Sequence, residues 1–424
     1  MHHQTGPEPQ GVSRRSVLKL TGMAAIGAGV AYTAVPAGQA HAAPVAGHTY
    51  PLEGAHQPGI LTPAQQQMQA AAFDLTTTSR DEVISLLTDW TEAARSMMAG
   101  RQLGQASLLP DSVPDDTGET MGSGPASLTI TFGFGNTFFV DAHGNDRFGV
   151  AKHLPHELTL GYGPIASSHL DPASCDGDLF IQACAEDPMV TLHAIHNLAR
   201  IALGRARLRW IQAGYGRTSS TSKNQETPRN LFGFKDGTNN IKAEEPVSAH
   251  NEHLWIQPGD DAGDVFAGGS YFCFRKIKQL MQAWDELSLE RQERIVGRAK
   301  DTGAPLSGGT EFTPPDFFAH AHSGALAIRK DSHVYVTHPD HNLGARMLRR
   351  GYNYIEGLDE FGQLNGGLFF IAFVRKPSRN FTPILKRMAR DTMTEFLIHV
   401  GTGMFIIPPG LRKGEKFIGS RVFD

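Results

Sequence analysis

The chain has 424 residues, of which 40% are hydrophobic and 19% charged, and it contains 46 glycines and 25 prolines. This length and composition predict a folded, turn-rich protein with two domains or one duplicated unit, and they exclude general disorder. With 39 Lys and Arg against 43 Asp and Glu, the net charge of -4 offers no basic field for nucleic acid or an anionic membrane. Three cysteines without a CxxC pair are too few for a disulfide framework or a structural zinc site.

Residues 1–42 are predicted to be a twin-arginine export signal. The pair Arg14 and Arg15 precedes an uncharged run rich in glycine and alanine, residues 20–35, and small residues of the A-x-A type follow it. The run is short and interrupted by glycines, so we expect no stable membrane insertion. We therefore expect transport by the twin-arginine translocase to an extracellular or periplasmic location. That route carries folded proteins, often with a cofactor already bound, so a cofactor is expected as well.

The first part of the exported chain is divided into a leader and a domain. Residues 43–74 are predicted to be an extended leader that packs late or not at all, because its beginning is rich in Gly, Pro and His. Residues 75–222 are the predicted N-terminal domain. Within it, Ser79 and Glu82 form a capping box, and apolar residues at helical spacing predict an amphipathic helix that Gly100 ends.

An internal repeat indicates how the rest of the chain is organised. Residues 177–188 match residues 366–377 at a constant offset, and both copies combine an apolar strand with a proline that opens a helix. We therefore predict two similar α+β halves, with a polar linker at 218–223 and a C-terminal domain over 223–424. Antiparallel-type strands alternating with helices favour duplicated ferredoxin-like halves, a dimeric α+β barrel-type fold within one chain. A doubly wound nucleotide-binding fold is disfavoured, because no Gly-rich phosphate-binding motif occurs at a strand-to-helix turn.

The second half contains several residues suited to chemistry. The segment 233–240 has two glycines that allow close backbone approach, with Asp236 between them. His333 lies beside a β-prone run, Arg349 is the first of two adjacent arginines, and residues 366–370 are an apolar Gly-Gly-Leu-Phe-Phe stretch. Each feature alone has an ordinary structural explanation as a turn, a core histidine, a solvated pair or a core strand.

Together these motifs resemble the dye-decolourising peroxidases, in particular the exported subgroup that includes the bacterial deferrochelatase/peroxidase. The resemblance is carried by Gly-x-x-Asp-Gly at 233–237, by Leu-Arg-Arg-Gly-Tyr at 348–352 and by the histidine shortly before it, and it covers residues 79–409. The export signal and the duplicated halves are also features of that family. The resemblance implies a secreted peroxidase that reduces hydrogen peroxide through an oxoferryl intermediate and oxidises dyes, phenolic compounds or other electron donors.

The resemblance also implies a non-covalent haem b and roles for individual residues. His333 would be the iron ligand, Asp236 the distal carboxylate, and Arg349 the distal arginine that also holds a haem propionate. Glu395 stands where the family places an acid behind the iron-ligating histidine. Four further residues are implied to line the haem pocket: Leu368, Phe370, Gly237 and Thr238. These residue types suit the chemistry, because a carboxylate can carry a proton between the peroxide oxygens and an arginine can stabilise the departing charge.

Other functions are open at this point. The same fold and cofactor would serve an iron- or haem-handling protein, by ferrous iron oxidation or a deferrochelatase-like reaction. A non-catalytic haem-binding module is a third reading, which the combination of Asp236 and Arg349 argues against, because a carrier needs no distal proton carrier.

Some residue assignments are open as well. His338 and His341 compete with His333 on spacing but lie in a Pro/Asp/Asn turn that would hold a ligand poorly. A metal site is a further alternative, formed either by His320 and His322 or by His338 and His341. A small apolar pocket would require bulky donors to use a surface route. The candidate residues for this surface route are the eight tyrosines and the four tryptophans, Trp90, Trp210, Trp255 and Trp284.

Overall fold

The computed structural model describes residues 47–104 and 111–424, and the predicted export signal lies outside the described residues. The described residues form one compact unit. Its described strands belong to a single antiparallel sheet. They are β1 (Gln67–Leu75), β2 (Thr129–Gly135), β3 (Leu179–Ala185), β4 (Ala206–Arg217), β5 (Ser270–Gln279), β6 (Leu348–Arg349), β7 (Tyr352–Leu358), β8 (Leu364–Val374) and β9 (Leu397–Ile407).

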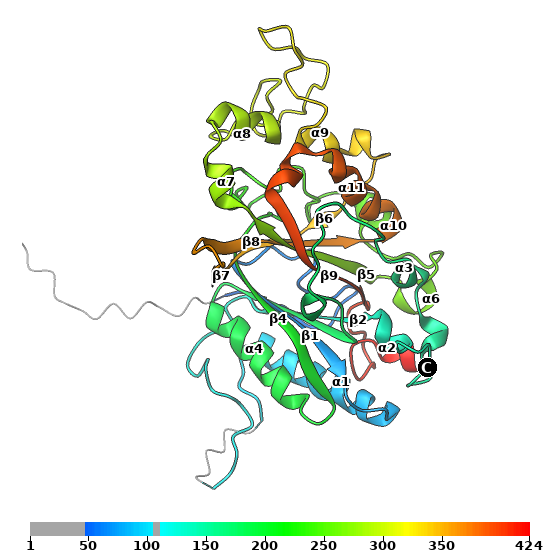
Figure 1. Ribbon diagram of the computed structural model, residues 1–424. Coiled ribbons are helices and arrows are strands. Elements are labelled where there is room, and N and C mark those ends of the chain that lie inside the picture. Colours follow the sequence, from blue (N-terminus) through cyan, green and yellow to red (C-terminus); the bar gives the residue numbers. More distant parts are fainter. Residues whose placement is uncertain (1–46, 105–110) are drawn as a thin grey trace, which may run out of the picture. The chain divides into compact units, whose positions relative to one another are not determined.

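The sheet consists of two ferredoxin-like halves joined edge to edge (Figure 1). Hydrogen bonding gives the order β4-β1-β3-β2 in the N-terminal half and β7-β8-β5-β9 in the C-terminal half. Pairing of β2 with β9 and of β4 with β7 closes the eight strands into a ring, and the short β6 pairs with β8. The repeated sequences form β3 and β8, which each lie between the first and second strands of their half. The predicted duplicated α+β fold is confirmed.

Helices cover the outer surface of the ring (Figure 1). The predicted capping box begins α1, where the hydroxyl of Ser79 accepts a hydrogen bond from the backbone N–H of Glu82 at 3.3 Å. Both copies of the repeat continue from the strand into a helix with proline in its first turn. The helices are α1 (Arg80–Met98), α2 (Asn136–Phe139), α3 (His156–Leu160), α4 (Pro188–Ile201), α5 (Val247–His253), α6 (Gly263–Phe266), α7 (Met281–Asp285), α8 (Leu289–Val296), α9 (His333–Thr337), α10 (Pro377–Asn380) and α11 (Thr382–Arg387). None in the described part of the chain is long and apolar enough to cross a membrane.

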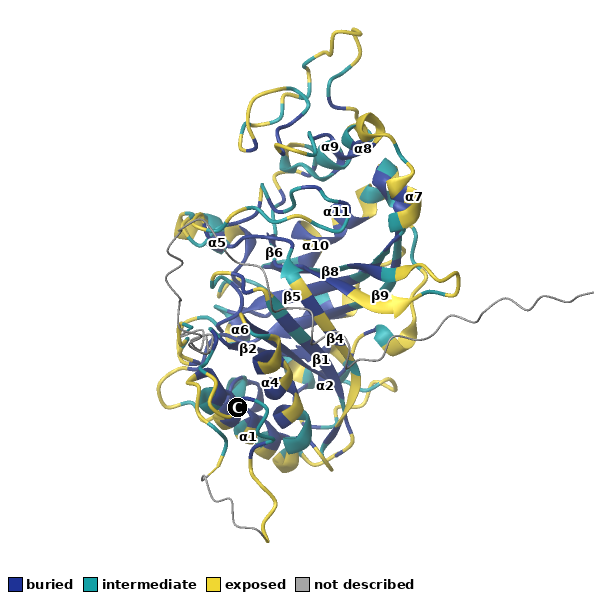
Figure 2. Ribbon diagram, turned by 90° about the vertical axis from the view of Figure 1, so that its left-hand side faces the viewer, coloured by how far each residue is buried: buried dark blue, intermediate teal, exposed yellow. Residues whose placement is uncertain are grey.

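The interior of the ring is a packed aromatic core. Alternate residues of each strand point inward. The ring of Phe180 lies 4.2 Å from that of Phe272 and 4.8 Å from that of Phe405, measured between centroids. Figure 2 shows the central strands as buried and the outer helix surfaces as exposed. Outward-facing residues of β1, β2 and β3 pack instead under α1 and α4, where Trp90 is 1% exposed.

The structure corrects the predicted leader. Residues 67–75 form β1, an inner strand that pairs with both β3 and β4. Ahead of it, Gln57 is 2% exposed and donates to the carbonyl oxygens of Phe132 and Pro408, both at 3.0 Å. The strand was missed because its centre is three alanines, which have low intrinsic β propensity, and neighbouring strands supply the pairing.

The predicted linker is also different from expectation. Residues 218–222 are buried, and side chains of the C-terminal half bond to them: the ammonium of Lys242, for example, donates to the carbonyl of Ser220 at 2.6 Å. The guanidinium group of Arg350, 0% exposed, donates to the carbonyl of Thr62 at 2.6 Å and to the hydroxyl of Thr221 at 3.5 Å. The Ser/Thr-rich composition therefore reflects a buried hydrogen-bonded segment.

Candidate functional site

His333 begins α9 and is held by a buried carboxylate. Its Nδ1 lies 2.6 Å from Oδ2 of Asp391, whose side chain is 0% exposed, and Oδ1 of Asp391 accepts from the backbone N–H of Met393 at 2.9 Å. Because a carboxylate only accepts, Nδ1 carries the proton. Burial lowers the pKa of His333, but Asp391, together with the charge of Asp236, outweighs burial and holds that pKa above its ordinary value. Nε2 has no hydrogen-bond partner among the described residues, and it is free to bind a metal ion.

Asp391, and not Glu395, is the acid behind this histidine. Both residues belong to the same short segment, in which Asp391 caps the 3-10 helix Thr392–Phe396. Glu395 lies within that helix and is exposed to solvent. The signal that could have found Asp391 is its N-capping position, because a capping aspartate has a fixed orientation.

Asp236 and Arg349 form an ion pair in the same site. Nη1 of Arg349 donates to Oδ1 of Asp236 at 3.0 Å, and the two side chains are 24% and 18% exposed. The amide of Asn230 donates to the other carboxylate oxygen at 3.3 Å. The charges of both members act on His333, the aspartate raising and the arginine lowering its pKa. The structure therefore brings the three predicted residues together, although they come from separate segments.

Local backbone structure explains where this pair lies. Gly237 has a positive φ of +84°, and a Cβ atom there would lie 2.9 Å from the Cα of Ser219. Only glycine allows the turn after Asp236 to approach that segment so closely. Asn240, which sequence reasoning missed, accepts from the backbone N–H of Arg349 at 2.7 Å and donates to its carbonyl at 2.8 Å. Two hydrogen bonds from the side chain of Asn240 thus join this turn to β6.

The apolar wall follows from strand register. Arg349 lies opposite Ala372 on β8, so its side chain shares a face with those of Phe370 and Leu368, two and four residues earlier. Both of these are partly exposed, whereas Phe369 between them is 1% exposed on the interior face. The predicted wall residues therefore lie on the same face of the sheet as the distal arginine.

Thr238 and the competing histidines have other contacts. The hydroxyl of Thr238 donates to Oε1 of Glu311 at 3.2 Å, so this side chain is directed toward another loop. His341 stacks on Tyr335 with 3.8 Å between centroids, and its Nδ1 lies 2.8 Å from the carbonyl of the same residue. His338 lies 3.4 Å from the exposed carboxylate of its near neighbour in the turn. Neither histidine is supported by a buried carboxylate like that behind His333.

Further cations surround Arg349, and sequence reasoning did not single them out. Burial, together with the charges of Arg349 and Arg217, lowers the pKa of Lys242 to about 8. Arg298 is 9% exposed, and its pKa is lowered by burial and by Arg349. Nε of Arg217 is buried without a hydrogen-bond partner in the described part of the chain. These clustered cations suit the carboxylate groups of a ligand.

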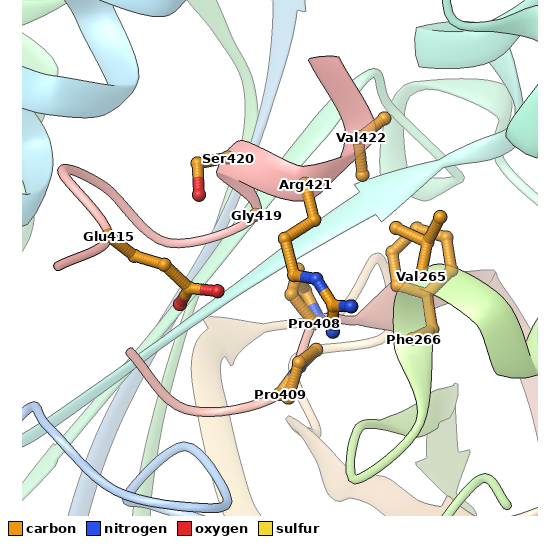
Figure 3. A pocket seen from close by; sticks show the side chains of 9 residues that line it. All are labelled: Val265, Phe266, Pro408, Pro409, Glu415, Gly419, Ser420, Arg421 and Val422. Carbon is orange, nitrogen blue, oxygen red and sulfur yellow. The ribbon is translucent and has the colours of Figure 1, made fainter. Parts of the chain in front are cut away.

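The donor set fits an iron cofactor that carries carboxylates and an apolar ring. It combines an imidazole with a free Nε2, a charged pair for the reacting oxygens, and a partly exposed apolar wall. A separate shallow pocket lies between α6 and the C-terminal segment (Figure 3). None of the predicted site residues lines it. Its lining residues are Val265, Phe266, Pro408, Pro409, Glu415, Gly419, Ser420, Arg421 and Val422.

Comparison with known proteins agrees with this site. The family model described as Dyp-type peroxidase, N-terminal, matches residues 57–216, and the one described as Dyp-type peroxidase, C-terminal, matches residues 227–412. A dye-decolorizing peroxidase of Thermobifida fusca (strain YX) is 32% identical over 447 residues, with 98% of each chain covered. A deferrochelatase of Escherichia coli (strain K12) is 31% identical over 376 residues, covering 87% of this chain and 86% of that protein. The solved structure of ferric DtpA from Streptomyces lividans has a TM-score of 0.79 and 36% identity, covering 89% of this chain and 98% of that chain.

Proposed function

Because the chain belongs to the Dyp-type peroxidase family, and is therefore a haem-dependent peroxidase that binds haem b non-covalently, we propose that it is an exported enzyme that oxidises dyes, phenolic compounds or similar donors with hydrogen peroxide. The observation that carries the proposal is the ion pair of Asp236 and Arg349 in the same site as His333, whose Nε2 is free.

Particular residues would hold the cofactor. Nε2 of His333 would bind the iron, and the carboxylate of Asp391 would keep the ring oriented and strengthen it as a ligand. Arg349 and Lys242 would face the haem carboxylates, while Phe370 would lie against the ring. When bound, haem supplies the electrons that reduce peroxide and recovers them one at a time from a donor.

The chain's own distal residues manage protons and charge. Reduction of hydrogen peroxide to two waters requires a proton to leave one oxygen and to reach the other before the O–O bond breaks. The carboxylate of Asp236 would accept that proton and return it to the departing oxygen. Arg349 cannot do so, because a guanidinium stays protonated up to a pH above about 12. Its fixed N–H groups would instead stabilise negative charge on the departing oxygen.

Bulky donors would need a separate place to react, and solvent exposure favours one tryptophan for this role. Trp90, Trp255 and Trp284 are at most 3% exposed, whereas Trp210 on β4 is partly exposed. Its indole N–H donates to the carbonyl of Asp176 at 2.8 Å. We assign Trp210 as the surface oxidation site. Trp210→Phe should slow turnover of a large anionic dye while leaving the reaction with peroxide unchanged.

The peroxidase function is tested with purified, haem-loaded protein. Absorption spectra before and after addition of peroxide, followed by a dye or phenolic donor, should show a change that the donor reverses. Asp236→Ala should slow the first step, and an unchanged rate would refute its role. Export is tested separately by replacing both Arg14 and Arg15 with lysine, which should retain the protein inside the cell. Export of that variant at the normal rate would refute a twin-arginine signal.

Similarity to deferrochelatases supports a second candidate, removal of iron from haem. Free porphyrin fluoresces whereas iron porphyrin does not, so emission from haem-loaded protein under reducing conditions distinguishes the two functions. The proposed donor oxidation predicts no porphyrin emission above that of His333→Ala mixed with haem. Emission that rises with time only in the unaltered protein would favour iron removal.

A further inference from the structure

The turn that carries Asp236 is fastened to a distant loop, residues 298–311. At the first end of the turn, Arg229 donates to the carbonyls of Gly233 at 2.7 Å, Lys300 at 2.5 Å and Asp301 at 2.7 Å. The contact is close, because a Cβ atom on Gly233 would lie 2.8 Å from Cε of Lys300. The side chain of Lys300 therefore packs directly against the backbone of the turn at Gly233.

A single carboxylate fastens the second end of the turn. Glu311 is 9% exposed, and its two oxygens have different partners: Oε2 pairs with the ammonium of Lys235, and Oε1 accepts from the hydroxyl of Thr238 at 3.2 Å. The loop that presents Glu311 is itself fixed, because buried Arg298 donates to the carbonyls of Glu311 at 2.8 Å and Gly303 at 2.7 Å. Burial raises the pKa of Glu311, but the hydrogen bonds from Lys235 and its other partners outweigh burial and keep that pKa below its usual range.

We propose that Glu311 is a positioning residue that holds Asp236 against Arg349. Lys235 and Thr238 stand on either side of the Asp236-Gly237 pair, so the carboxylate fixes both ends of the segment between them. Besides Arg349, the carboxylate of Asp236 has one side-chain partner among the described residues, the amide of Asn230 at 3.3 Å. The orientation of its carboxylate therefore depends on the turn that carries it. This inference rests on the proposed proton transfer by Asp236.

Glu311→Gln tests the ion pair, because glutamine has the same shape and still offers an oxygen to Thr238. A reacting group displaced by about 1 Å can lose up to roughly a hundredfold in rate, and this partial change should cost about tenfold in the first peroxide-dependent absorption change. Cyanide binding to the haem-loaded protein, which also transfers a proton on the distal side, should weaken in parallel. Glu293→Gln is the matched control, because that carboxylate accepts from the backbone N–H of Lys300 at 2.8 Å but does not touch the turn.

The same change made in Asp236→Ala protein separates positioning from a general structural role. If Glu311 acts through Asp236, Glu311→Gln has no further effect on rate or cyanide affinity in that background. An equal loss in both backgrounds would overturn the proposal. If Glu311→Gln does not retain haem, Thr238→Val is tested in its place. We expect a smaller loss of rate from Thr238→Val, and no further loss when it is combined with Asp236→Ala. A normal rate in the single variant Asp236→Ala would refute the role of Asp236. This measurement does not involve Glu311, so it distinguishes failure of the proposed function from failure of this inference.

Discussion

Replacing Arg349 with leucine is expected to slow the reaction with peroxide more than replacing Asp236 with alanine, at neutral pH. The two side chains are paired at 3.0 Å, so each variant also disturbs the other residue. The two residues differ in whether another group can take over their chemical role. Both side chains are partly exposed, so water can enter the place of the aspartate and carry the proton. Leu368 and Phe370, on the same face, offer no charge in place of the arginine.

The size of the effect follows from the loss of fixed donors. One oriented N–H donor toward a developing oxyanion contributes about 3 kcal/mol, or roughly a hundredfold in rate. Lys242 does not compensate, because its ammonium donates to the carbonyl of Ser220 at 2.6 Å. We therefore expect Arg349→Leu to slow the first peroxide-dependent absorption change about a hundredfold, and Asp236→Ala to slow it less.

Stopped-flow absorption spectra of both variants, mixed with peroxide at equal haem loading, measure this difference. Haem content is measured first, because Arg349 is also proposed to contact a haem carboxylate. A nearly normal rate in Arg349→Leu, with a slower Asp236→Ala, would show that proton transfer and not charge stabilisation limits the reaction. The order of the two residues would then be reversed.

Three other substitutions test the site and the fold. His333→Ala should lose most of its haem while its far-ultraviolet circular dichroism stays unchanged, and a normal Soret band in this variant with loss in His341→Ala would contradict the ligand assignment. Asp391→Asn should weaken haem binding about 10- to 100-fold in a titration of haem-free protein, because it removes the charge behind the ligand. Glu395→Gln is the control, and equal losses in both variants would contradict the assignment of Asp391 as the acid behind His333. Arg350→Met should lower the free energy of unfolding by about 3 kcal/mol, because Oε1 of Gln65 and the carbonyl of Ile60, both in buried residues, lose this donor. An unchanged melting temperature would show that water replaces those contacts.

Local patterns predicted the elements that carry their own signals. The capping box at Ser79 and the helical spacing after it were sufficient for α1. The repeated strand–proline–helix sequences located β3 and β8 in equivalent positions. By contrast, β1 has an alanine-rich centre, and its strand conformation depends on two partners more than 100 residues further along the chain. Residues 218–222 have a linker's composition, and only tertiary contacts make them buried.

The site residues likewise fall into those that belong to local motifs and those that depend on tertiary contacts. The glycines around Asp236 and the arginine pair at Arg349 stand in short motifs, so a resemblance could identify them. Asp391 and Glu395 are four residues apart in a 3-10 segment, and composition does not say which of them faces the histidine. Glu311 is 75 residues from Asp236, and no local pattern links the two. Its contact exists only because of the path of the loop that carries it.

The pairing of β2 with β9 sets the order in which the chain can finish folding. The residues joined at this seam, such as Phe134 and Ile406, are separated by most of the protein. The seam between β4 and β7 likewise joins the two halves. During synthesis the edge of β4 must therefore stay open until β7 has left the ribosome, and the edge of β2 until β9, the last strand, has done so; such edges invite pairing with other chains. The ring cannot close before β9 is available, so a chain truncated before β9 would expose the edge of β2 and aggregate.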